Sequence, residues 1–456
     1  MDKQLLKTIR FEEILQWDVK QFYITRISSK FRIDKLGNHI IHETKKYQLS
    51  NEPDKDFNIL GVSNKEGMYD AYTLKGREIK QKYHKVEDDW LVYNPYRINV
   101  GSIGIKTKDL KGEYISPAYV VFSCKETVLP EYIFFLIKTD TFNKLINDST
   151  TGTVRQTLHF EKIAEINIPV PTIKEQKEIL KEYNETLMEI EKLKEKLHVI
   201  ERKKDSYLLD VLGIVDVEIA DKHDCLNILK IKSFTELLNW DAKGFDSKYR
   251  PEELFKSEKY RNARMLDLCE MNPITTFKEI CNDEVTFVPM DNVSAKYGIL
   301  EKKEVKNASF SKGYTRFKEN DILWAKITPC MQNGKCFIAR DLKNGYGYGS
   351  TELNVFRAND NVLPEYLFIF LRSKKLRSMA EHFLTGTAGQ QRVSKKFFER
   401  LYIPIVEKLK NRESDITQET IVNHYNSLNE EFMNISMKID NMYQRLNMRF
   451  EERIYY

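Results

Sequence analysis

Val128-Leu129-Pro130-Glu131-Tyr132 occurs twice in this chain, the second time as Val362-Leu363-Pro364-Glu365-Tyr366. The two copies are 234 residues apart (364 minus 130), and each continues into an apolar, aromatic run that is typical of a buried helix. Thr151-Gly152-Thr153 recurs at the same separation as Thr385-Gly386-Thr387. Matches in the same order at one separation indicate two copies of a single structural unit.

Further matches extend the repeat in both directions. Downstream, Ile168-Pro169 pairs with Ile403-Pro404 at a separation of 235, and near the start 11–18 pairs with 234–241 at a separation of 223. The drift in separation predicts small insertions in surface loops, which tolerate them. Two copies are too few for a solenoid, so we expect a pseudo-twofold protein.

Each copy is followed by a charged segment in which apolar residues recur every three or four positions. In the first segment, 174–212, these residues are Ile179, Tyr183, Leu187, Ile190, Leu193, Leu197, Ile200, Tyr207 and Val211. In the second they are Ile421, Tyr425, Leu428, Phe432, Ile435, Ile439, Met442 and Leu446. Alternating steps of three and four are typical of a coiled-coil seam, so we expect two long helices that pack on each other. The alternative is two amphipathic helices packed on separate cores.

The remainder of each copy is typical of short strands and turns. Runs rich in β-branched and aromatic residues, bounded by Gly, Asn and Asp, occur at 57–62, 90–93, 119–122, 285–288 and 322–324. We therefore expect a mixed α/β (α+β) fold in which each repeated domain is followed by a long helix. The predicted parts are domain 1 at 1–172, the first helix at 173–213, domain 2 at 214–412 and the second helix at 413–456.

Composition limits the class of protein. With 41% hydrophobic and 31% charged residues, the 456-residue chain can bury real cores. The net charge of +5 permits nucleic-acid binding without demonstrating it. Six cysteines do not make a disulfide framework. The charged opening and the shortness of every apolar run predict a cytoplasmic protein that does not enter a membrane.

The sequence lacks the common catalytic and cofactor motifs. There is no Walker A loop and no G-x-G-x-x-G after a strand. Cys330 and Cys336 are badly spaced for zinc, and His39 and His42 have no suitably spaced acidic partner. Asn94-Pro95-Tyr96 and Pro329-Cys330 resemble fragments of methyltransferase motifs but stand without a cofactor loop. We therefore expect no metal, no cofactor bound by this chain and no catalytic activity of its own.

One set of motifs extends over nearly the whole chain: Thr151-Gly152-Thr153-Val154-Arg155, Ile168-Pro169-Val170-Pro171, Glu175-Gln176, Phe287-Val288-Pro289-Met290-Asp291, Ala325-Lys326-Ile327-Thr328-Pro329-Cys330, Asn333-Gly334-Lys335, Gly349-Ser350-Thr351-Glu352 and Thr385-Gly386-Thr387-Ala388-Gly389-Gln390-Gln391-Arg392. With these motifs and its two-copy layout, the chain strongly resembles the specificity (S) subunit of type I restriction–modification systems. Two departures concern the loops. The second copy lacks the Pro and Glu-Gln that should follow Ile403-Pro404-Ile405, and the first lacks Ala-Gly-Gln before Arg155.

The resemblance implies a non-catalytic DNA-recognition subunit. Two target recognition domains would each read one half of a bipartite sequence in double-stranded DNA, and the two helices would pair antiparallel and set the spacer between the half-sites. Two methyltransferase (M) subunits, which bind S-adenosylmethionine, would dock on the helices, and restriction (R) subunits would join for cleavage. Because the middle parts of the two copies differ, we expect an asymmetric target.

Candidate DNA contacts lie in the polar loops that follow strands, because base edges are read by Arg, Asn and Gln, and phosphates are bound by Lys, Arg, Ser, Thr and backbone amides. In the first copy they are Tyr96, Arg97, Asn99, Ser102, Thr153, Arg155 and Gln156. In the second copy they are Lys326, Thr328, Gln332, Asn333, Lys335, Gln390, Gln391 and Arg392. Either repeated arginine, Arg155 or Arg392, could instead pair with a carboxylate.

Other readings remain open on sequence alone. A non-DNA-binding adaptor would also use paired helices to recruit proteins, and it would bind no specific DNA when a methyltransferase subunit is present. A self-sufficient methyltransferase or nuclease would turn over with S-adenosylmethionine or a divalent metal. A third possibility keeps the family and changes the use, as a subunit that redirects another system or serves a related phage-defence system.

Overall fold

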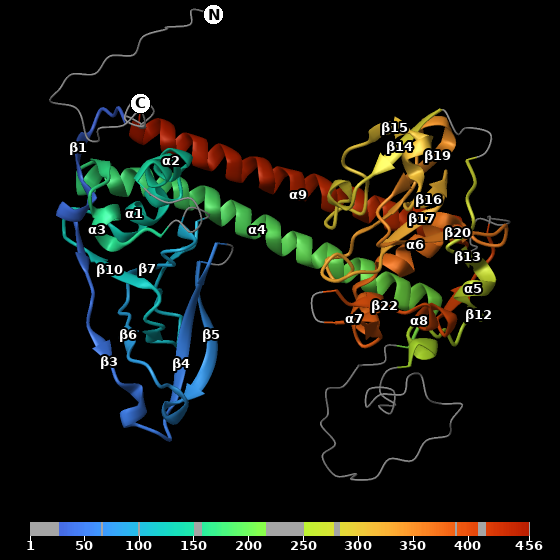
Figure 1. The fold of residues 1–456 in the computed structure, drawn as a ribbon, viewed down its shortest axis with the longest axis horizontal. Helices are drawn as coiled ribbons and strands as arrows, with labels where there is room; N and C mark the ends of the chain where they lie inside the picture. The colour runs from blue at the N-terminus through green and yellow to red at the C-terminus, as the bar shows by residue number, and fades with distance from the viewer. Residues whose placement is uncertain are drawn as a thin grey trace, which may run out of the picture. The chain divides into compact units, whose positions relative to one another are not determined.

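The computed structural model describes residues 27–64, 67–98, 101–149, 157–215, 250–277, 283–387, 390–408 and 416–455. Their contacts form two compact units (Figure 1). The first unit takes the chain up to Leu193 together with Lys438 onward, and the second takes Lys194–Met437. Each long helix therefore contributes one half to each unit. The four-part division proposed from sequence stays a prediction, because the contacts do not separate the helices from the domains.

Each unit contains a four-stranded antiparallel sheet, which we call the inner sheet, and the two inner sheets have the same strand order. In the first unit the order is β2 (Ile40–His42), β10 (Val120–Cys124), β7 (Leu91–Tyr93) and β8 (Ile103–Ile105). In the second unit it is β13 (Cys269–Met271), β20 (Leu353–Ala358), β17 (Ile322–Ala325) and β18 (Cys336–Ile338). The matching topology confirms that the chain is two copies of one structural unit.

A two-stranded ladder accompanies each inner sheet. It joins β1 (Arg32–Lys35) to β11 (Asn167–Val170) in the first unit and β12 (Arg261–Arg264) to β23 (Tyr402–Ile405) in the second. Both ladders are antiparallel, and in each the second strand carries the repeated Ile-Pro pair. The second unit also contains the hairpin of β21 (Leu384–Thr385) and β22 (Arg392–Val393); most of the equivalent residues of the first unit lie outside the described part of the chain.

A further sheet, which we call the outer sheet, is present in both units and has one more strand in the first. In the first unit the order is β3 (Lys46–Tyr47), β6 (Tyr83–Lys85), β9 (Tyr114–Ile115), β4 (Asp56–Ser63) and β5 (Gly67–Lys75). In the second unit it is β15 (Glu304–Asn307), β14 (Glu284–Val288), β19 (Tyr346–Gly349) and β16 (Thr315–Lys318). Read from the other edge, the second order corresponds to β6–β9–β4–β5 of the first unit, and each pair keeps its direction, including the parallel pair of β4 with β9 and β14 with β19. The outer sheets are therefore also repeated, and the first unit adds the edge strand β3.

The inner sheet lies between two apolar cores, because successive side chains of a strand point to opposite faces. In β17, Ile322 and Trp324 belong to the core that contains the helices, whereas Leu323 and Ala325 belong to the core beneath the outer sheet. In β7, Leu91 and Tyr93 face the helices, and Val92 faces the other way. The sheet thus separates the helical side of each unit from its outer sheet.

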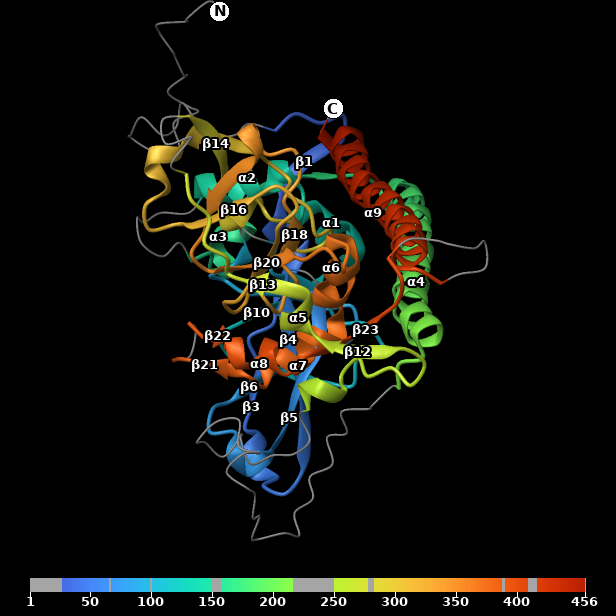
Figure 2. The ribbon, with the colours of Figure 1, turned by 90° about the vertical axis from the view of Figure 1, so that its right-hand side faces the viewer.

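Short helices cover the helical side. In the first unit they are α1 (Pro130–Ile137), α2 (Asp140–Ser149) and α3 (Phe160–Ala164). In the second unit they are α5 (Met265–Leu268), α6 (Pro364–Arg372), α7 (Lys374–Glu381) and α8 (Lys395–Glu399). Within the first unit, Figures 1 and 2 both show β4 and β5 extending away from these helices.

The repeated pentapeptide and the repeated Ile-Pro pair form one structural contact. Pro130 and Pro364 occupy the first turn of α1 and α6, where a missing backbone N–H has no consequence. The hydroxyl of Tyr132 donates a hydrogen bond to the carbonyl of Pro169 at 2.8 Å, and Tyr366 donates to Pro404 at 2.7 Å. The two motifs recur together because each tyrosine binds the proline that the other motif supplies.

The first long helix, α4 (Ile173–Leu212), carries a buried glutamine in its first turn, and so does the second, α9 (Gln418–Tyr455). The side chain of Gln176 accepts from the amide of Leu129 and donates to the carbonyls of Thr127 and Pro171. Gln418 repeats all three bonds with the equivalent partners Leu363, Asn361 and Val406.

This finding corrects the sequence analysis, which found no second Glu-Gln after Ile403-Pro404-Ile405. The glutamine is present at 418, but an insertion moves it from the expected separation to 242 residues (418 minus 176). The three glutamine contacts are therefore the same in both copies, although Gln176 is the fourth residue of α4 and Gln418 is the first residue of α9.

The two long helices pack antiparallel, as the views in Figures 1 and 2 agree. In the first unit, Tyr183 lies 3.4 Å from the side-chain oxygen of Asn447, and Glu189 pairs with Lys438 at 3.0 Å. In the second unit, the ring of Tyr207 lies 4.0 Å from that of His424. Every apolar position predicted for either seam is buried or half-buried, which confirms the coiled-coil prediction.

The helix ends also complete the cores of the two units. The first core holds Ile179 and Leu180 from the start of α4 together with Phe450, Ile454 and Tyr455 from the end of α9. The second core holds Leu208 and Leu212 from the end of α4, and Ile421 and Val422 from the start of α9. At about 1.5–3 kcal/mol per fully buried side chain, this burial outweighs the exposed ion pairs between the helices, which contribute at most about 1 kcal/mol each.

We expect Gln418→Ala to destabilise the protein by about 2 kcal/mol, because it leaves the half-buried amide of Leu363 and the buried carbonyl of Val406 without their partner. Urea unfolding should show a lower midpoint. Gln444→Ala, at an exposed position of the same helix, is the matched control and should leave the midpoint unchanged. Equal midpoints for the two variants would contradict a structural role for the buried glutamine.

Candidate nucleic-acid interface

In the second unit, the loop between β17 and β18 lies directly against the hairpin β21–β22. The amide of Thr328 donates to the carbonyl of Gln391 at 3.0 Å, and the amide of Val393 donates to the carbonyl of Lys326 at 3.0 Å. An isolated bridge joins Ile327 to Arg392. The candidate DNA contacts on these two segments therefore lie next to each other.

Arg392 is held by a carboxylate. Its Nε and Nη2 atoms donate to the two oxygens of Glu352 at 2.8 and 2.7 Å, and Nη1 donates to the carbonyl of Gln390 at 2.9 Å. This bidentate pair is the alternative that the sequence analysis left open for the repeated arginine. Glu352 also accepts the Lys326 amide through its own carbonyl at 2.9 Å, so one residue connects the loop and the hairpin. Arg392 therefore orders the site before any ligand binds.

The other predicted residues of this loop divide into exposed and engaged groups. Gln332, Asn333 and Gln390 are exposed, whereas Thr328 is half-buried. Lys335 is half-buried, and its ammonium donates to the carbonyl of Met290 at 2.8 Å. A ligand that approaches this surface therefore first meets the three amide side chains.

In the first unit, the turn after β7 presents Tyr96, which is 59% exposed, and the exposed Arg97. Ser102 is 3% exposed, and its hydroxyl donates to the carbonyl of Val62 at 3.3 Å. This burial argues against the predicted phosphate contact of Ser102. The polar sequence of the loop did not show that Ser102 packs against β4. The predicted residues Asn99, Thr153, Arg155 and Gln156 lie outside the described part of the chain.

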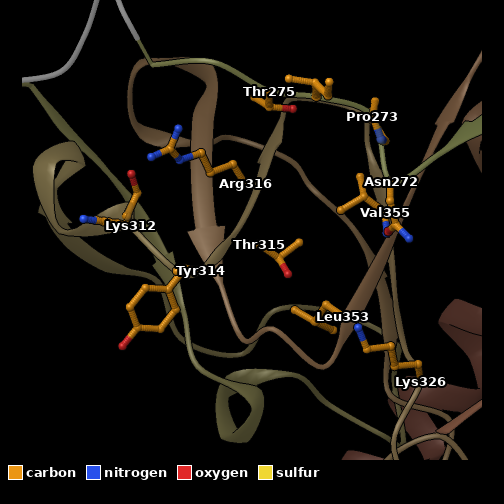
Figure 3. A pocket seen from close by; sticks show the side chains of 13 residues that line it. Asn272, Pro273, Thr275, Lys312, Tyr314, Thr315, Arg316, Lys326, Leu353 and Val355 are labelled. Carbon is orange, nitrogen blue, oxygen red and sulfur yellow. The ribbon is translucent and has the colours of Figure 1, made fainter.

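A pocket of about 420 Å³ opens beside the β17 end of the second-unit loop (Figure 3). Lys312, Arg316 and Lys326 line it together with Asn272 and Tyr314. Of its lining residues that the structure describes, none is acidic. The Arg316 guanidinium lies 5.0 Å from the centre of the Phe277 ring, and Tyr314 is 46% exposed. An anionic ligand with flat rings would find both charge and stacking surface here.

Sequence reasoning identified only Lys326 of this basic group. Lys312, Arg316 and Asn272 come from the outer sheet and from the link to it, where the first copy has the equivalent strand β6 but a different sequence, Gln81-Lys82-Tyr83-His84-Lys85. The run Lys312-Gly313-Tyr314-Thr315-Arg316, basic and aromatic around a glycine, was the available signal. Gly313 has a φ of 83°, which suits glycine in this turn.

The described residues offer neither a metal site nor a membrane span. Within the described residues, no group of three His, Cys, Asp or Glu side chains could hold a metal ion. Over the same residues, no helix is long and apolar enough to cross a membrane. Burial raises the pKa of the Cys269 and Cys336 thiols to about 12, so neither is a reactive thiolate near neutral pH.

Comparison with known proteins identifies the class. The chain matches the type I restriction modification DNA specificity domain at residues 29–202 and again at 257–435. These two matches cover more than half of the chain, which therefore belongs to this family and carries two tandem recognition domains.

The chain is similar to two curated proteins of Escherichia coli. It is 40% identical over 143 residues to the type I restriction enzyme EcoEI specificity subunit, which is 30% of this chain and 24% of that protein. It is 40% identical over 139 residues to the EcoAI specificity subunit, which is 30% of this chain and 23% of that protein. The matched segments thus span about a quarter of each relative.

Similarity to solved structures is more distant. A chain from a type I R-M system, solved for its complex assembly and conformational transition, is 13% identical with a TM-score of 0.49, over 94% of this chain and 98% of that chain. The HsdS subunit from Thermoanaerobacter tengcongensis is 14% identical with a TM-score of 0.38, also over 94% and 98%.

We expect Glu352→Gln to reduce the acid sensitivity of the second unit. The hydrogen bond from Arg392 lowers the pKa of Glu352 below its usual 4.5, so its stabilising effect is complete above about pH 4.5 and is lost as the pH falls through the lowered value. The stability difference between the parent and the variant, measured by urea unfolding, should be constant above pH 5 and shrink below pH 4.5. The exposed Glu301→Gln is the control and should show no such change. A difference independent of pH would refute the pairing.

Proposed function

We propose that this chain is the DNA-recognition subunit of a type I restriction–modification complex. The observation that carries the proposal is the pocket of Lys312, Arg316 and Lys326, which has three cations and, among its described lining residues, no carboxylate. Lys and Arg supply the phosphate contacts that dominate DNA affinity. Because the pocket lies in a domain of the DNA specificity family, the ligand that fits it best is the DNA backbone.

Base reading is assigned to the exposed planar side chains near this surface. Gln332, Asn333 and Gln390 in the second domain, and Arg97 in the first, can form paired hydrogen bonds with base edges. Tyr96 offers a stacking face. We keep as proposed base contacts Asn99, Arg155 and Gln156, and as a proposed phosphate contact Thr153. Arg392 acts chiefly by ordering its loop through its pair with Glu352.

One domain per half-site gives a bipartite target, and the structure supports two different half-sites. Both sheets, the tyrosine–proline contacts and the glutamine contacts are repeated, but the residues on the outer sheets are not. The basic pocket of the second domain is lined partly by Lys312-Gly313-Tyr314-Thr315-Arg316, and the equivalent run at β6 of the first domain is Gln81-Lys82-Tyr83-His84-Lys85. An asymmetric target follows.

The paired helices are proposed to set the spacer and to bind two methyltransferase subunits. Methionines stand on their exposed faces, with Met188 and Met448 each 61% exposed and Met437 46% exposed. Exposed apolar side chains on a helix pair are typical of protein-binding faces, and methionine adapts well to a partner surface. In this proposal the methyltransferase subunits bind S-adenosylmethionine, restriction subunits complete the assembly, and this chain performs no catalysis.

The decisive experiment is methylome sequencing of cells that express this chain together with a methyltransferase gene from the same operon, against cells that lack this chain. A new methylated motif with two short specified parts and a fixed gap would establish the function and give the target. Complex formation without a new motif would favour the non-DNA-binding adaptor.

Neutralising the pocket should weaken DNA binding without changing the preferred sequence. For Lys312→Gln or Arg316→Gln, we expect the slope of log K against log salt to fall by about 0.9 per lost phosphate contact. Fluorescence anisotropy of the complex with methyltransferase subunits, on duplex DNA at several salt concentrations, measures this slope. Lys256→Gln, at an exposed position outside the pocket, is the control. Unchanged slopes in both pocket variants would exclude the pocket from the interface.

Lengthening the helices should lengthen the gap in the target. Four residues inserted after Lys194 in α4, with four inserted after Met437 in α9, add about one turn to each partner, roughly 6 Å. Because one base pair rises about 3.4 Å, methylome sequencing should show the same two half-sites separated by about one or two more base pairs. Insertion of four residues in a surface loop, after Lys343, should leave the gap unchanged. An unaltered gap in the lengthened variant would disprove the spacer role.

A further inference from the structure

A second polar cavity lies entirely within the second unit and is separate from the pocket of Lys312, Arg316 and Lys326. Its volume is about 370 Å³, and α4, α9, the α6–α7 junction and the loop at Lys296 line it. The charged lining residues that the structure describes are six basic side chains and two carboxylates: Arg202, Lys204, Lys296, Arg372, Lys374 and Arg377, with Glu201 and Asp205. The excess positive charge is four, which is large for a cavity between packed helices.

Arg377 is one of the cations that make up this excess positive charge. Its Nε atom is buried, and within the described residues it has no hydrogen-bond partner. Burial, with a smaller contribution from Arg372, lowers the pKa of the guanidinium. Its Nη1 atom sits so close to Gly334 that a Cβ there would lie 1.7 Å away. A partly buried guanidinium normally pairs with an anion, because desolvating an unpaired charge is costly.

The neighbouring cations are fixed in place. The guanidinium of Arg372 donates to the carbonyls of Lys296 at 2.9 Å and Gly334 at 3.3 Å. The ammonium of Lys204 lies 4.5 Å from the centre of the Phe432 ring, and burial, followed by the charge of Arg372, lowers its pKa. Arg372 is therefore held by neutral carbonyls, and Lys204 lies over an aromatic ring with the carboxylates Glu201 and Asp205 nearby.

We propose that this cavity binds an oxyanion of the phosphate class. A tetrahedral dianion accepts bonds from several donors at once and carries enough charge to offset a large part of the excess, whereas one carboxylate carries a single charge. Lys374, exposed at the start of α7, completes the set of donors at the mouth. The anion could be free phosphate or a phosphodiester of bound DNA, which share this chemistry.

The cavity also lies behind a proposed reading loop, because Gly334 contacts both arginines and belongs to the loop that carries Gln332 and Asn333. An anion bound to Arg377 would therefore stabilise the position of that loop. Anion binding itself goes beyond the DNA-recognition proposal and does not depend on it, since only the DNA source requires that the chain bind DNA.

The first test is thermal unfolding of the full chain in inorganic phosphate and in chloride at equal ionic strength. We expect phosphate to raise the unfolding temperature of the parent protein in a saturable way. Arg377→Gln and Lys374→Gln should each weaken the apparent phosphate affinity about tenfold. Arg445→Gln, which removes an exposed charge from α9, is the control and should keep the parent affinity.

A second arm distinguishes the two sources of phosphate. If a DNA phosphodiester occupies the cavity, Lys374→Gln should reduce the salt slope of duplex binding by about 0.9, and if free phosphate occupies it, the slope should not change. Both results support an oxyanion site. Equal unfolding temperatures in phosphate and chloride, or equal phosphate affinity in the parent and both cavity variants, would overturn the proposal. Loss of methyltransferase binding by the variants without any phosphate effect would also overturn it, in favour of an acidic segment of that partner.

Discussion

The buried glutamine at the start of each long helix is the contact on which the arrangement of each unit depends. Gln176 and Gln418 each join three backbone groups that come from a strand end, from the turn before the repeated pentapeptide and from that pentapeptide itself. The helix therefore leaves its domain in one fixed direction. A water molecule or a shorter side chain could satisfy some of these groups, but only a buried amide of this length reaches all three.

Because the direction is fixed at both starts, each helix end arrives where the other helix begins. The final turns of α9 complete the first core with Phe450, Ile454 and Tyr455, and the final turns of α4 complete the second with Leu208 and Leu212. Neither unit has a full core without a segment that is remote in sequence. The two possibilities weighed from the sequence, a coiled-coil seam and helices packed on cores, are thus both realised along different parts of the same helices.

The sequence predicted those features that are repeated or periodic. The seam residues could be read from a spacing of three and four, and the two copies from motifs at one separation. Gln418 was missed because an insertion breaks that separation just before it. The pairing of Arg392 with Glu352 and the burial of Ser102 depend on partners 40 residues away in the chain, which local pattern cannot supply. Lys312 and Arg316 were missed because the equivalent strand of the first copy carries different residues, so no repeated motif marks them.

The same inner sheet explains how recognition can vary while the framework does not. Its strands send alternate side chains to two separate cores, so Trp324 packs with the helices while its neighbour Leu323 packs beneath the outer sheet. Substitutions in the core beneath the outer sheet then have little effect on the helix contacts, because the inner sheet separates the two cores. The loop that contains Gly334 is an exception, because Gly334 contacts Arg372 and Arg377 directly. Through this contact, ligand binding on the recognition surface can influence the helices, and a change in the helices can influence ligand binding.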